Sequence, residues 1–72
     1  MDKSAIAEDI RAQALARELL GGRPMKVREL VGFICVNSSP GISEEASKAA
    51  VIKLLKTGQI EQDPSGYLHL RP

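Results

Sequence analysis

The sequence predicts a small α+β domain built from three helices and a C-terminal β-hairpin. Apolar residues recur at helical spacing in the segments on either side of a Pro-Gly break at positions 40 and 41. Beyond Gly58 their spacing changes to the alternation that is typical of strands. The 72 residues are enough for one domain spanning 1–72, which would bury only about 60% of the surface of its unfolded chain.

Composition limits the compartment and the partners that we expect. Ten basic and nine acidic residues give a net charge of +1, so nucleic-acid binding would require a local basic patch. Cys35 is the single cysteine, which excludes an internal disulfide and fits a reducing compartment. The sequence has no apolar run of the roughly 18 residues that a membrane span needs, and no signal-peptide pattern at its start. We therefore predict a cytoplasmic protein with no membrane association.

The first helix is predicted over residues 5–20, with Ser4 as its N-cap and the glycines at 21 and 22 as its end. Its apolar residues form two nearly opposite stripes, one of Ile6, Ile10 and Ala14 and the other of Ala12, Leu15 and Leu19. Two interpretations remain open. Either the rest of the domain covers this helix from both sides, or Leu15 and Leu19 are exposed and form the interface of a homodimer.

The second helix is predicted over residues 27–36 from the core-facing spacing of Val27, Leu30, Val31 and Ile34. Met25 and Lys26, directly before it, form either a short strand or a turn. Asn37 is expected to end the helix in a left-handed conformation, and Pro40 and Gly41 then form a bend.

The third helix is predicted over residues 43–57. Ser43 is its expected N-cap, and Glu44 and Glu45 lie in the first turn, where the helix dipole favours negative charge. Gly58 is expected to cap its C-terminus. The predicted inward face consists of Ala50, Val51, Leu54 and Leu55.

The hairpin is predicted over residues 59–70. Its turn, Asp63-Pro64-Ser65-Gly66, has proline and glycine at the positions that a type I turn favours. Alternation directs Ile60, Leu68 and Leu70 towards the core, and Tyr67 and His69 towards solvent.

The segment "VIKLLKTGQI" resembles the end of the recognition helix in the winged helix-turn-helix family. In that pattern apolar residues lie seven and four positions before a glycine and two positions after it, and here these are Val51, Leu54 and Ile60 around Gly58. The resemblance extends over nearly the whole chain. It implies a three-helix winged helix-turn-helix fold whose wing is a two-stranded hairpin, with the third helix entering the DNA major groove.

The function implied by this resemblance is that of a small DNA-binding transcriptional regulator, similar to those of phages and plasmids. Its partner would be double-stranded DNA, contacted by the third helix, the wing and the start of the second helix. The side chains on these segments that we expect to bind DNA are Arg28, Ser43, Ser47, Lys48, Lys53, Lys56 and Arg71.

Several residues depart from the DNA-binding pattern. The positions that usually reach bases are occupied by Glu45, Ala46, Ala49 and Ala50, which are poor readers of base edges. The tip of the wing carries no cation, and Ile52 is expected on the outward face of the third helix. The alternative function is therefore a protein-interaction module, an inhibitor or assembly factor, that docks through Ala49 and Ile52.

The sequence offers little for chemistry. His69 is the only histidine and Cys35 the only cysteine, which is too few ligands for a zinc site. Cys35 lies in an apolar run and is expected to be a small core residue. We predict no metal, no cofactor, no catalytic residues and no enzymatic activity.

Overall fold

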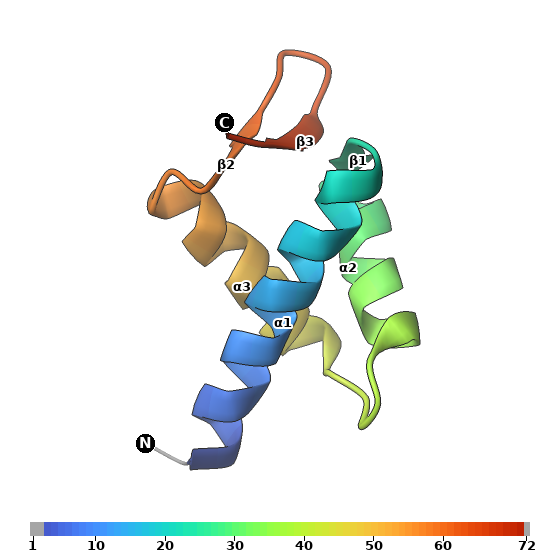
Figure 1. Ribbon diagram of the computed structural model, residues 1–72, viewed down its shortest axis with the longest axis vertical. Helices are drawn as coiled ribbons and strands as arrows, with labels where there is room; N and C mark the ends of the chain where they lie inside the picture. Colours follow the sequence, from blue (N-terminus) through green and yellow to red (C-terminus); the bar gives the residue numbers. More distant parts are fainter. Residues whose placement is uncertain (1–2, 72) are drawn as a thin grey trace.

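The computed structural model describes residues 3–71, in which three helices are combined with a three-stranded antiparallel sheet. Along the chain the elements are α1 (Lys3–Gly22), β1 (Met25–Lys26), α2 (Val27–Asn37), α3 (Glu44–Lys56), β2 (Ile60–Gln62) and β3 (Tyr67–Leu70). The helices form one cluster, and the sheet lies at the end of it where α2 begins and α3 finishes (Figure 1). The predicted α+β architecture, three helices with a C-terminal hairpin, is confirmed.

The sheet contains one strand more than the predicted hairpin. Met25 and Lys26 form β1, which pairs with β3 through Met25 opposite Leu68 and Lys26 opposite Tyr67. The strand order is therefore β1-β3-β2, with β3 in the centre. Residues 25–26 therefore form a strand and not a turn. This strand ties the connection between α1 and α2 to the C-terminal strand.

The core is aliphatic and draws on every element of the fold. Neither aromatic residue belongs to it: Phe33 and Tyr67 lie at the surface, each beneath a cation, with Arg23 over Phe33 and Lys26 over Tyr67. Leu70, which was expected to be buried, is 37% exposed because it lies at the end of β3 beside Gly21. The largest fully buried apolar side chains are Leu30, Ile34, Val51, Leu54, Ile60 and Leu68.

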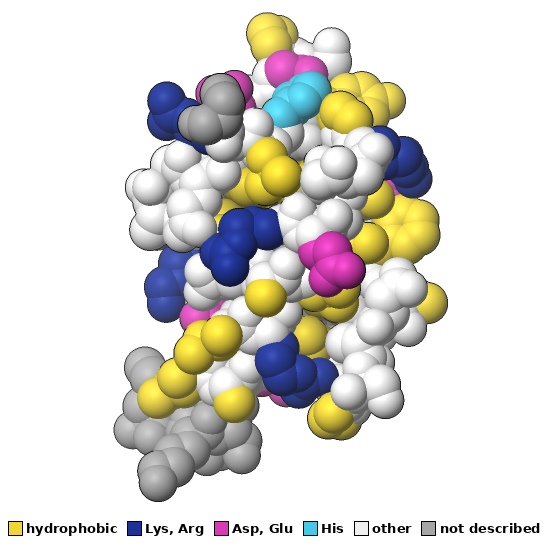
Figure 2. Space-filling model, in the orientation of Figure 1, with side chains coloured by type: hydrophobic (Ala, Val, Ile, Leu, Met, Phe, Trp, Pro, Cys, Tyr) yellow, Lys and Arg dark blue, Asp and Glu magenta, His cyan; other side chains and the backbone are white. Residues whose placement is uncertain are grey.

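The helix α1 presents to solvent a different stripe from the one that we considered for a homodimer. Leu15 and Leu19 are half-buried and pack against the core, which contradicts the interpretation in which they are exposed; the homodimer stays a prediction. Ile6 and Ile10 are exposed instead, with 44% and 61% of their surface accessible. Hydrophobic side chains are visible over this N-terminal half of α1 at the lower left of Figure 2.

The start of α1 differs from the prediction. Since α1 already begins at Lys3, Ser4 lies inside the helix and is not its N-cap.

The ends of α2 and α3 show how the bend between them is held. Asn37 is the last residue of α2 and donates from Nδ2 to the Phe33 carbonyl at 2.8 Å, so the predicted left-handed cap is wrong. The chain leaves α2 through Ser38 in extended conformation, and the Ser38 hydroxyl accepts from the Ile42 amide at 2.8 Å. Ile42 is buried, which anchors the bend against the core.

Both predicted caps of α3 are present. Ser43 has extended backbone angles, and its hydroxyl accepts from the Ala46 amide at 3.1 Å. At the other end, Gly58 has a φ of 77°, and the Gln59 and Gly58 amides donate back to the Leu54 and Leu55 carbonyls at 3.0 and 3.2 Å. This is the Schellman pattern, which requires a residue in the left-handed conformation.

Two glycine-to-alanine variants test this account of the backbone. We expect Gly58→Ala to lower the free energy of unfolding by about 1 kcal/mol, because an L-residue is strained at a φ of 77°. Gly32→Ala is the matched control, since it lies inside α2 where an added Cβ meets nothing within 4 Å. It should raise the free energy of unfolding by about 0.5–1 kcal/mol. Urea denaturation measures both changes, and the same sign for the two variants would contradict the assignment.

Candidate nucleic-acid interface and adjacent groove

The outward face of α3 combines lysines with two apolar side chains. Lys48, Lys53 and Lys56 are exposed along the helix, together with Ala49 and Ile52, of which Ile52 is 50% accessible. Ala50, Val51 and Leu54 occupy the opposite side and anchor α3 in the core. The exposure expected for Ala49 and Ile52 is confirmed.

Two of the three lysines on α3 already have acidic partners. Lys48 Nζ lies 3.3 Å from Glu44 Oε1, one turn earlier on the same helix. Lys53 Nζ lies 3.2 Å from Asp9 Oδ2 on α1, and Gln13 Nε2 donates to the same carboxylate oxygen at 2.8 Å. Both lysine side chains remain more than half exposed, at 58% and 60%. Ion pairs of this kind contribute roughly 0–1 kcal/mol and exchange readily for other anions.

The remaining predicted cations lie on neighbouring elements. Arg28 is exposed in the first turn of α2 and faces Lys48 across a groove. Arg71 follows β3, where its amide donates to the Gln59 carbonyl at 3.2 Å and its Nε lies 3.9 Å from Glu61. The start of α2 thus places a cation across the groove from Lys48.

The two serines predicted to bind DNA have structural roles in α3. Ser47 is completely buried, and its hydroxyl donates to the Ser43 carbonyl at 2.8 Å, so it cannot reach a phosphate. Ser43 is the N-cap and also donates to Glu8 Oε1 at 3.3 Å.

The positions expected to face bases are only partly exposed. Ala50 is fully buried and Ala46 is half-buried. Among the four positions expected to face bases, only Glu45 and Ala49 are exposed.

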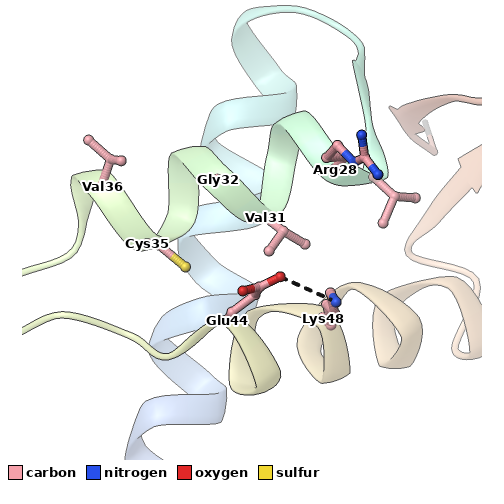
Figure 3. A pocket seen from close by; sticks show the side chains of 8 residues that line it. Arg28, Val31, Gly32, Cys35, Val36, Glu44 and Lys48 are labelled. Atoms are coloured by element: carbon pink, nitrogen blue, oxygen red, sulfur yellow. Dashed lines mark ion pairs between the residues drawn. The ribbon is translucent and has the colours of Figure 1, made fainter.

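A groove of about 680 Å³ opens between α2 and the N-terminal half of α3. Figure 3 shows Arg28 and Lys48 at one end of it, and Cys35 and Val36 towards the other. Sequence reasoning missed this groove, although Gly32 within a helical segment was a signal for it. Its lining consists of Val27, Arg28, Val31, Gly32, Cys35, Val36, Glu44 and Lys48.

The tip of the β2–β3 hairpin is held by an Asp–His contact. Asp63 Oδ1 accepts from the Ser65 and Tyr67 amides at 2.9 Å each, and His69 Nε2 lies 2.8 Å from Asp63 Oδ2. His69, which was expected to point towards solvent, is partly exposed and contacts Asp63. The hydrogen bond from His69, followed by that from the Tyr67 amide, holds the pKa of Asp63 below its ordinary value.

We compared the chain with models of protein families, with curated proteins and with solved structures. None of them matches it. In residues 3–71 no helix has the length and apolar character needed to cross a membrane. Across the same described residues, no three His, Cys, Asp or Glu side chains are grouped so as to hold a metal ion. The site must be interpreted from its own geometry.

The lowered pKa of Asp63 predicts that the hairpin tip loosens in acid. A carboxylate whose pKa is lower in the folded state contributes stability that is fully present above about pH 4, its unfolded pKa, and is lost as the pH falls through the folded pKa. Amide chemical shifts of Ser65 and Tyr67, followed from pH 7 to pH 2, measure this loss. His69→Gln should move the transition to higher pH, and Asp63→Asn should remove it. An unchanged acid transition in Asp63→Asn would contradict the assignment.

Proposed function

We propose that this chain is a small winged-helix DNA-binding regulator that contacts phosphates through the outward face of α3 and the start of α2. The observation that supports it best is the arrangement of Lys48, Lys53 and Lys56 on that face, with Arg28 beside Lys48. Four cations lie on these two adjoining helices, two of them paired with Glu44 and Asp9, on a chain whose net charge is only +1.

The existing ion pairs are compatible with this proposal. A phosphate that displaces Glu44 from Lys48, or Asp9 from Lys53, replaces an exposed contact of small free energy. The gain comes from releasing the counterions condensed on DNA, which is a favourable entropy at low salt. Binding of this type should therefore be strong at low ionic strength and weak near physiological salt.

The same face provides little for reading sequence. Ala49 and Ile52 can make apolar contacts with thymine methyl groups, and Glu45 can accept from the cytosine amino group. Bidentate readers such as Arg, Asn or Gln are missing from the exposed positions of α3. The turn of the hairpin carries Asp63 and no cation, so it adds no phosphate contact. We therefore propose binding with low sequence preference.

A second candidate function follows from Ile52. Its side chain is 50% exposed next to the exposed Ala49, and this small apolar surface on α3 suits a protein partner better than a phosphate backbone. In this alternative the chain is a docking module that uses the same face of α3.

The salt dependence of DNA binding tests the proposed contacts. Lys48→Gln and Lys53→Gln should each reduce the slope of log K against log salt by about 0.9, because each removes one phosphate contact. Fluorescence anisotropy with a random duplex between 20 and about 200 mM salt measures the slope. Arg23→Gln, outside α3 and at the turn after α1, is the charge-matched control and should leave it unchanged. Slopes that stay the same in both lysine variants would exclude these residues as contacts.

Two substitutions of Ile52 separate the candidates. On a DNA-binding face, Ile52→Lys should strengthen binding to the duplex and Ile52→Glu should weaken it, each by roughly two- to tenfold at low salt. The reason is that they add a positive or a negative charge near the phosphates. Both variants should fold normally, since the side chain is already half exposed. Loss of DNA binding in both variants would contradict the proposed geometry. Absence of DNA binding by the unchanged chain at low salt would favour the docking module.

A further inference from the structure

The groove between α2 and α3 has the size and composition of a small-molecule site. Its volume of about 680 Å³ falls within the roughly 300–1,000 Å³ of known ligand pockets. Five of its eight lining residues, namely Val27, Val31, Gly32, Cys35 and Val36, are apolar. We propose that the groove binds a small amphipathic carboxylate, a compact apolar body that carries one carboxyl group.

The apolar body would lie on the valines of α2. Val31 is buried at the base of the groove, whereas Val36 is 81% exposed at its edge. Between them, an added Cβ at Gly32 would meet nothing within 4 Å. The absence of a side chain at Gly32 therefore leaves free space along the α2 wall of the groove.

The carboxylate would lie between Arg28 and Lys48. These two cations come from different helices and line the same end of the groove (Figure 3). Lys48 has Glu44 as a partner at 3.3 Å, whereas no ion pair of Arg28 occurs within residues 3–71. A guanidinium in this position can hold a carboxylate through two parallel hydrogen bonds. The polar end of the ligand is thus assigned to Arg28, with Lys48 as the second donor.

Cys35 provides a reporter inside the groove. It is half-buried, its Sγ lies 3.6 Å from Ser47 Oγ, and it is the only thiol in the chain. A ligand that occupies the groove should shield it from a thiol reagent. This inference does not depend on DNA binding, although a ligand on Arg28 and Lys48 would compete with phosphates for the same two cations.

The test uses 2-naphthoate as the probe, with 2-naphthylmethanol and 2-naphthylmethylamine as uncharged and cationic controls of similar shape. We expect 2-naphthoate to shift the Gly32 amide resonance and to slow modification of Cys35 by a disulfide reagent at least about twofold at saturation. The Kd should be on the order of 1 mM for a ligand of this size. The proposal would be overturned if the alcohol or the amine bound as tightly as naphthoate, or if naphthoate had no effect at about 10 mM.

Four variants locate the binding mode. Arg28→Gln should weaken the binding of naphthoate about fivefold. Glu44→Gln should strengthen it about twofold, because it removes the carboxylate that competes for Lys48. Gly32→Leu should fill the groove and abolish binding, whereas Gly32→Ala is the matched control that leaves room for the ligand. Unfolding curves establish that each variant is folded. Undiminished binding to folded Gly32→Leu, or the same affinity in Arg28→Gln as in the unchanged chain, would overturn the assignment.

Discussion

The pairing of β3 with a strand on each side is the constraint on which the rest of the structure depends. β1 continues directly into α2, and β2 follows α3 after the Gly58 turn. By holding both strands, β3 fixes the start of α2 relative to the end of α3. Leu68, in the middle of β3, is fully buried and contributes to the core at this junction. At the opposite end, the buried Ile42 anchors the bend between the two helices.

With both ends of the helix pair held in this way, the space between α2 and α3 depends on the side chains that face it. Val31 fills the base, and Gly32 contributes nothing above it, so a groove remains. The aliphatic core leaves no large ring to occupy that space, since Phe33 lies outside it beneath Arg23. The same orientation of α3 that buries Val51 and Leu54 directs its lysines outward.

Local rules were enough to predict most of the fold from the sequence. The Ser43 cap, the left-handed Gly58 and the inward faces of α2 and α3 depend on residues a few positions apart, which spacing and capping preferences describe well. The site was less predictable because its features depend on tertiary contacts. Lys53 pairs with Asp9, which lies 44 residues earlier, and Ser47 is buried with its hydroxyl 3.6 Å from Cys35 Sγ on α2. The third strand and the groove likewise exist only once distant segments meet.

The pairing of Lys48 with Glu44 affects both of the anions that we propose for this surface, the phosphates of DNA and a small carboxylate. Glu44 stays on the same helix whatever the dilution, so it would compete for Lys48 with any bound anion at a constant effective concentration. It weakens phosphate and carboxylate alike. Selectivity must then come from the second cation that each anion reaches: Lys53 and Lys56 further along α3 suit an extended backbone of phosphates, whereas Arg28 across the groove suits a single compact carboxylate. If both proposals hold, the spacing of the cations around Lys48, and not the net charge of the chain, would decide between the two ligands.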